Sequence, residues 1–301
     1  MTVKSKDSKT MIFSTQNHVM VKSFGQEEGD KLLMDAGYPA LDMSFFGDIY
    51  SYIFEDDYRQ RAAKMKAAAS SRGVIYNQAH APFGGGFENY TTNLIPQFQR
   101  VFEFCGLLGV RQIIVHPIQR GQYFGNEKEI FDLNIEFYKS LAPMAKENGV
   151  KIAIENMWQR HYVNKQIIDD ICADPHELAA MYDTLNDPDA FTVCLDIGHV
   201  ALCRREPDEA IRILGHDRLG ALHVHDVDYV SDLHTLPGIQ KINWDKVCQA
   251  LGEIDYKGEL TLEADNFLKN FEDGFKPAAA RFMAETARYL ADKVDSYRIK
   301  S

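Results

Sequence analysis

The sequence has few of the features that would place it outside the ordinary globular proteins. None of its apolar runs approaches the ~18 residues of a membrane span, and the N-terminal stretch MTVKSKDSKT lacks the apolar middle of a signal peptide. No C-x-x-C pair occurs among the five cysteines, an odd count whose members stand in apolar runs such as TVCLDI. This cysteine usage indicates buried free thiols in a reducing compartment, so we expect a cytoplasmic protein with no membrane partner.

Positive charge is also scarce, because 33 Lys and Arg face 44 Asp and Glu, for a formal net charge of −11. Affinity for a nucleic-acid backbone comes from neutralising phosphates, so this balance argues against DNA or RNA as the main partner. The Gly84-Gly85-Gly86 run lacks the G-x-G-x-x-G spacing of a dinucleotide site. No Pro/Gly-rich linker divides the chain, and we expect one domain over residues 1–301 with residues 1–9 as a loose tail.

A repeated strand-then-helix pattern dominates the sequence. Short β-branched apolar runs alternate with charged, periodic segments typical of helices, such as 56–73, 174–185 and 277–294. The eight expected strands are 10–16, 38–44, 73–80, 111–117, 150–157, 191–199, 220–227 and 258–265. Eight such units in a chain of this length predict an α/β fold, a single (β/α)₈ TIM barrel; a doubly wound open sheet is the alternative.

Imidazole and carboxylate side chains gather at the ends of the expected strands, where a TIM barrel places its active site. They are His80, His116, Glu155, Asp196, His199, His223, His225, Asp226, Glu263 and Asp265, followed in a loop by Asp232 and His234. Buried carboxylates and imidazoles side by side need a compensating group, and a divalent cation accepts both kinds of ligand. The sequence therefore predicts a metal site, with Mn²⁺, Co²⁺ or Zn²⁺ as the expected ion.

Five motifs, IENM, CLDIGH, LHVHD, DLHTLPG and LTLEAD, together resemble the xylose-isomerase-like TIM barrels. That superfamily includes sugar and sugar-phosphate isomerases, ketose 3-epimerases, inosose dehydratases and AP endonucleases of the endonuclease IV type. The resemblance implies that Glu155, Asp196, His223 and Glu263 bind one divalent metal. His223 is preferred to His225 because it stands three residues before Asp226, as in the family's H-x-x-D pattern.

The resemblance also implies roles for the remaining residues. His80, His116 and His199 are expected from it to contact substrate, and Asp232 and His234 are additional metal or substrate ligands. From the residues themselves, His225, on the same strand face as His223, and Trp158, an aromatic residue just after the fifth strand, are also expected to contact substrate. Glu155 and Glu263 are the expected catalytic acid/base pair of an isomerase, epimerase or related lyase that takes a proton next to a metal-chelated carbonyl of a sugar or polyol. The segment HDVDYVSDLH lacks the arginine that ketose 3-epimerases carry there. A multi-metal hydrolase of the endonuclease IV type is the alternative activity. A third possibility is a degenerate barrel that only binds a ligand. The sequence leaves open whether the protein forms a homo-oligomer.

Overall fold

The computed structural model describes residues 10–298, and the expected tail at 1–9 lies outside the described residues. Eight parallel strands form one sheet, in the order β10-β1-β2-β3-β4-β5-β8-β9. They are β1 (Phe13–Gln16), β2 (Ala40–Ser44), β3 (Ile75–His80), β4 (Gln112–Val115), β5 (Lys151–Glu155), β8 (Phe191–Asp196), β9 (Leu219–His223) and β10 (Leu260–Leu262). A parallel bridge between Val224 and Leu262 joins the two ends of this order, so the sheet closes into a TIM barrel, which confirms the predicted fold class.

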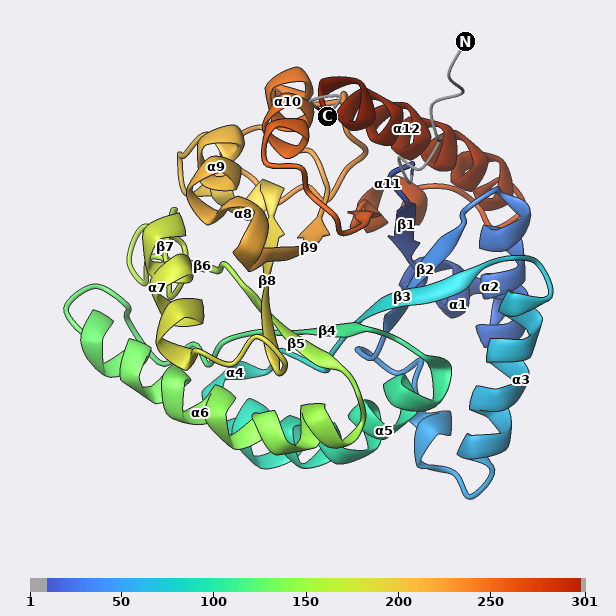
Figure 1. The fold of residues 1–301 in the computed structure, drawn as a ribbon, viewed down its shortest axis with the longest axis horizontal. Coiled ribbons are helices and arrows are strands. Elements are labelled where there is room, and N and C mark those ends of the chain that lie inside the picture. Colours follow the sequence, from blue (N-terminus) through green and yellow to red (C-terminus); the bar gives the residue numbers. More distant parts are fainter. Residues whose placement is uncertain (1–9, 299–301) are drawn as a thin grey trace, which may run out of the picture.

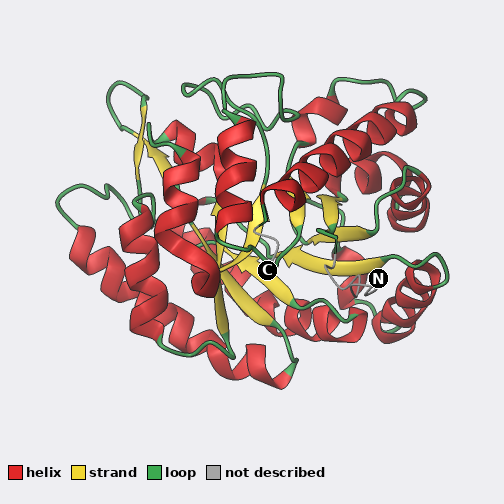
Figure 2. Cartoon of the chain, turned by 45° about the horizontal axis from the view of Figure 1, so that its top comes forward, coloured by secondary structure: helices red, strands yellow, loops and turns green. Residues whose placement is uncertain are grey.

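Helices surround the strands on the outside (Figures 1 and 2). The longer ones are α1 (His18–Phe24), α2 (Gln26–Asp35), α3 (Tyr58–Ser70), α5 (Phe98–Leu108), α6 (Glu127–Glu147), α7 (Pro175–Leu185), α9 (Pro207–Arg218), α10 (Trp244–Glu253) and α12 (Lys276–Tyr297). Short helical segments are α4 (Gly86–Asn89), α8 (Ile197–Leu202) and α11 (Asp265–Lys269), with single turns at Ser51–Phe54, Tyr90–Leu94 and Ile95–Gln97. None of the helices within residues 10–298 is long and apolar enough to cross a membrane.

Several strands end two to four residues earlier than predicted. The expected strand 191–199 stops at Asp196, whose side chain accepts the backbone N–H of His199 at 2.7 Å and caps helix α8. His199 therefore lies in a helix rather than at a strand end, and Asp265 similarly begins α11. His116, His225 and Glu263 follow their strands by one or two residues.

An antiparallel hairpin, β6 (Trp158–Arg160) paired with β7 (Ile167–Asp169), interrupts the alternation after β5 and was not among the expected elements. It lies outside the barrel sheet, beside α7 in Figure 1. Arg205 anchors it through two hydrogen bonds to the Asp169 carboxylate, at 2.9 and 2.7 Å. Such a short two-stranded element depends on packing and anchoring of this kind rather than on its own pairing.

Two apolar layers hold the barrel together. The larger cluster fills the space between strands and helices, and includes Ile152, Ile154, Leu195 and Leu222. The smaller one lies inside the barrel and consists of Ile114, Ala153, Cys194 and Ala221, all with no exposed surface. Side chains on a strand alternate between its two faces, so the residue two positions after each of these four residues also points into the barrel. Those four residues are His116, Glu155, Asp196 and His223, so the small apolar layer forms a floor beneath the polar strand ends.

Candidate metal centre

Four side chains meet at the centre of the barrel mouth. Ligand atoms of Glu155, Asp196, His223 and Glu263 all lie within 4.8 Å of one another, and all four residues are buried. The Nδ1 atom of His223 is 2.7 Å from Oε1 of Glu155 and 3.1 Å from Oε2 of Glu263. The structure thus brings together the four residues for which the sequence predicts metal binding, from β5, β8, β9 and the end of β10.

This arrangement fits a divalent cation on its own chemistry. Three buried carboxylates and one imidazole offer ligand atoms within 4.8 Å of one another, and carboxylates removed from water together need positive charge beside them. Burial raises the pKa of Glu263 to about 8, against the opposing effect of His223 and His234. For Glu155 burial acts in the same direction, but His223 and His116 outweigh it and hold the pKa of that carboxyl well below its ordinary value. Carboxylate oxygens with a neutral imidazole are ligands that Zn²⁺ and related ions accept.

His80 and His116 lie against the outer side of Glu155. The Nε2 atom of His116 is 2.9 Å from Oε2 of Glu155, and the two imidazoles approach each other with Nε2 atoms 3.1 Å apart. Burial and the neighbouring His116 lower the pKa of His80 well below its usual range, so this ring is neutral at pH 7. Both rings contact Phe83, with centroid distances of 4.8 and 4.7 Å. Phe83, Phe87 and His116 also line a small recess at the mouth.

A second group of possible ligands lies beside the first and consists of His199, His225, Asp232 and His234. His225 donates through Nε2 to Oδ1 of Asp196 at 3.0 Å, and its ring stacks on that of His234 at 4.1 Å. Oδ1 of Asp232 is 3.1 Å from Nε2 of His234. The pKa of His234 is raised to about 10, since Asp232 and Glu263 outweigh the effect of burial. Asp196 is therefore shared between the two groups.

The two histidines of the HVHD motif are divided between these groups. His223 faces Glu155 and Glu263, whereas His225 contacts Asp196 and His234 and is fully buried. The position of His225 depends on Gly198, because a Cβ atom there would lie 2.1 Å from Cε1 of the imidazole. This close approach explains the glycine in the motif CLDIGH. That His223 rather than His225 binds the metal in the first group stays a prediction. The placement of the two histidines in different groups supports it.

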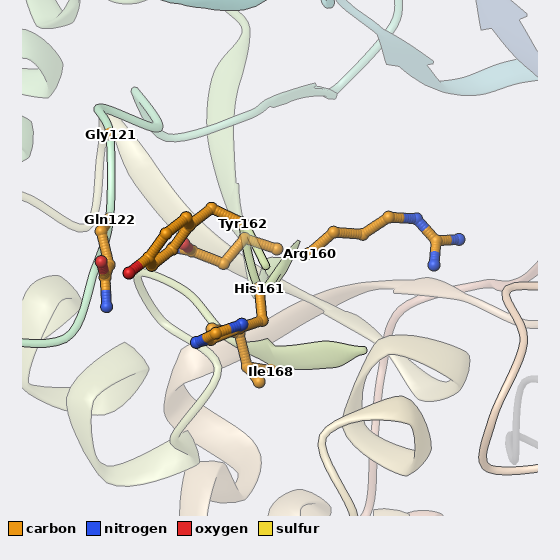
Figure 3. Close-up of a pocket in the computed structure, with 7 residues that line it drawn as sticks. Gly121, Gln122, Arg160, His161, Tyr162 and Ile168 are labelled. Atoms are coloured by element: carbon orange, nitrogen blue, oxygen red, sulfur yellow. The ribbon is translucent and has the colours of Figure 1, made fainter. Parts of the chain in front are cut away.

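The predicted contact residue Trp158 begins strand β6 at the rim. Its ring is 6.3 Å from that of His199 and nearly perpendicular to it, and the Arg160 guanidinium lies 5.3 Å from the Trp158 ring centre. Further out, Gln122, Arg160 and Tyr162 line a recess of about 350 Å³ beside the hairpin. In Figure 3 the Arg160 side chain extends away from Gln122 and Tyr162. This larger recess lies at the hairpin, and none of the predicted metal ligands lines it.

Two supporting residues on the first strands were not among the predicted site residues. Gln16 of β1 donates through Nε2 to Oε1 of Glu263 at 2.9 Å, and Asp42 of β2 lies beneath His223 with its Oδ2 3.8 Å from Nε2. Both are buried polar residues, Gln16 on the strand FSTQ and Asp42 on the strand ALDMS. A long polar side chain within an expected strand is the signal that could have identified them, since a buried polar side chain needs a partner.

Comparison with known proteins agrees with this geometry. A family described as xylose isomerase-like TIM barrel matches residues 31–291. An uncharacterised protein of Methanocaldococcus jannaschii, MJ1311, is 29% identical over 167 residues, which cover 54% of this chain and 53% of that protein. The chain spans about half the length of the curated relatives it matches.

Solved structures show the same fold at low sequence identity. A D-tagatose 3-epimerase-like protein superposes with a TM-score of 0.71 at 20% identity, covering 94% of this chain and 100% of that one. The IOLI protein, solved with a bound zinc atom, superposes with a TM-score of 0.67 at 19% identity over 96% of this chain and 100% of that one.

Proposed function

Because the chain belongs to the xylose isomerase-like TIM barrel family, we propose that it is a metal-dependent isomerase, epimerase or related lyase acting on a sugar or polyol. The observation that carries this proposal is the buried group of Glu155, Asp196, His223 and Glu263 at the mouth of the barrel. The fold shared with a D-tagatose 3-epimerase-like protein and with the zinc-bound IOLI protein supports it. The five free cysteines support a reducing, cytoplasmic compartment.

The proposed reaction begins with removal of a proton from the carbon next to a carbonyl. A divalent ion held by the four residues would polarise the carbonyl and stabilise the charge that develops on its oxygen. Glu155 and Glu263 are the acid and base, because each has a carboxylate at the centre and they come from strands separated by β8 and β9. A substrate between them is accessible to one carboxylate on each face, so one removes a proton and the other returns one.

The remaining residues bind and enclose the substrate in this proposal. His80 and His116, next to Glu155, offer imidazole nitrogens to sugar hydroxyls. Phe83 and Trp158 present aromatic surface at the rim, which suits the apolar C–H face of a carbohydrate. The His199 ring lies beside Trp158, with ring centres 6.3 Å apart.

Solvent hydrogen exchange tests the mechanism. On a substrate found by screening sugars and inositols, the wild-type enzyme in heavy water is expected to incorporate deuterium next to the carbonyl. Glu155→Gln and Glu263→Gln keep an oxygen but remove the base, and each should reduce turnover by about 10²–10⁴-fold. The exposed Glu272 provides a matched control, because Glu272→Gln makes the same change away from the centre. Full turnover without deuterium uptake would refute the two-base scheme.

The second group of ligands favours one alternative, a multi-metal hydrolase of the endonuclease IV type. His199, His225, Asp232 and His234 lie close enough together to hold a further ion beside the first. Counting metal ions per chain by elemental analysis separates the two activities. One ion per chain supports sugar chemistry, and three support hydrolysis of a phosphodiester. The net charge of −11 favours the former, because a nucleic-acid substrate gains little from an acidic protein.

A further inference from the structure

Asp42 lies inside the barrel directly beneath the imidazole of His223, and both residues have no exposed surface. Its Oδ2 atom accepts a hydrogen bond from Nε2 of Gln78 at 2.8 Å and is 3.8 Å from Nε2 of His223. Its Oδ1 atom has no hydrogen-bond partner among residues 10–298, and the same is true of Nε2 of His223. The space below the candidate metal centre thus holds a carboxylate oxygen and an imidazole nitrogen that both lack a partner.

The Asp42 carboxylate, whose Oδ2 is 3.8 Å away, and Nε2 of His223 complement each other once His223 acts as a ligand. Its Nδ1 atom faces Glu155 and Glu263, so this is the nitrogen directed at the metal position. A neutral imidazole that binds a metal through Nδ1 carries its proton on Nε2. That N–H points into the closed interior, where an unpaired donor costs about 1–3 kcal/mol.

The neighbouring imidazole of His80 does not take that proton. The His80 ring is parallel to the His223 ring at a centroid distance of 5.5 Å, and its Nε2 atom is directed at His116. A hydrogen bond between N–H and O requires about 2.7–3.2 Å, so a ring movement of about 1 Å toward Asp42 closes the gap. Gln78 holds the carboxylate in place from the neighbouring strand, since Asp42 and Gln78 are register partners of β2 and β3.

We propose that Asp42 is a positioning residue, whose carboxylate accepts the Nε2 proton of His223 and so presents Nδ1, unprotonated, to the metal. The inference rests on the proposed metal centre and adds to it a residue from the opposite side of the barrel. Asp42 touches neither the metal position nor a substrate in this arrangement. A carboxylate behind a ligating histidine fixes the tautomer and the orientation of the ring, and loss of such a group typically weakens metal binding by about 10–100-fold.

The test compares metal affinity in three variants of the full chain, measured with Zn²⁺ and a competing chelator. Asp42→Ala removes the acceptor and is expected to weaken Zn²⁺ binding by about 10–100-fold. Asp42→Asn keeps an acceptor oxygen and should recover part of that loss. Ser44→Ala is the matched control, because Ser44 is buried on the same strand two residues further along and its Oγ atom also lacks a hydrogen-bond partner. Its affinity should equal that of the wild type.

Nitrogen NMR of ¹⁵N-histidine-labelled protein supplies a readout that does not depend on activity. In the Zn²⁺-loaded wild type, the proton on Nε2 of His223 should resonate downfield as a hydrogen-bonded proton, and Asp42→Ala should lose this downfield shift. Wild-type affinity together with an unchanged Nε2–H resonance in Asp42→Ala would overturn the inference, as would an equal loss of affinity in Ser44→Ala. A wild-type protein that binds no Zn²⁺ would instead refute the proposed function, so the two failures are distinguishable.

Discussion

The buried carboxylate of Asp226 provides the sharpest prediction about stability. It has no exposed surface and accepts five N–H groups, all from the loop after β9 and the start of α10. Oδ1 accepts the backbone N–H groups of Val227 and Ile242 at 3.0 and 3.1 Å; Oδ2 accepts those of Gly238 and Gln240 at 2.8 and 2.9 Å and the indole N–H of Trp244 at 3.0 Å. One side chain therefore organises the segment that carries Asp232 and His234.

The substitution Asp226→Asn replaces one of these two oxygens by an NH₂ group. If the amide oxygen takes the place of Oδ2, the N–H groups of Val227 and Ile242 lose their acceptor and face a donor instead. Each unsatisfied buried group costs about 1–3 kcal/mol, so we expect a loss of about 2–6 kcal/mol. The free energy of unfolding of a folded domain is about 5–15 kcal/mol, so this single substitution would remove a large fraction of it.

Urea unfolding followed by circular dichroism measures this loss, and hydrogen exchange of residues 227–243 measures its local part. The matched control is Asp228→Asn, the same substitution in the same loop. Asp228 accepts the N–H groups of Val230 and Ser231 through Oδ1 alone, at 2.9 and 2.7 Å, so an asparagine oxygen keeps both. A loss below about 1 kcal/mol for Asp226→Asn, or one no larger than in the control, would refute the reasoning.

Three further predictions concern the centre and the N-terminal half of the barrel. Asp196→Ala and His223→Ala should each lower metal occupancy while circular dichroism shows an intact fold; normal occupancy in both would mean that the site is misplaced. His225→Ala should keep more metal at the four-residue centre than His223→Ala, because His225 belongs to the second group and only contacts Asp196 through Nε2. An equal loss of metal in both variants would contradict this division. Tyr76→Phe should destabilise the fold by about 1–3 kcal/mol in urea unfolding, because it removes a 2.6 Å hydrogen bond to the buried Asp30 carboxylate; an unchanged midpoint would contradict it.

The architecture could be predicted from the sequence because it depends on local patterns. Apolar residues repeat every two positions in strands and about every 3.6 positions in helices, and both repeats can be seen in consecutive residues. The alternation of the two patterns indicates parallel strands with crossover helices. The polar residues that end these runs, such as Glu155 and Asp196, could be located for the same reason. The β6–β7 hairpin could not, because its three-residue strands depend on an anchor from Arg205, far along the chain.

Contacts between side chains of different strands depend on how the barrel closes. Spacing along the chain places His223 and His225 on one side of a strand, but only the closed sheet directs one toward Glu155 and the other toward Asp196. Asp42 illustrates the same limit. It stands 181 residues before His223 in the sequence, and no local pattern relates a residue of β2 to one of β9. The order of the strands along the chain and the polar residues at their ends could be predicted from the sequence. Which of these side chains meet depends on the tertiary structure, because contacts across a barrel are set by strand register, tilt and closure rather than by neighbouring residues.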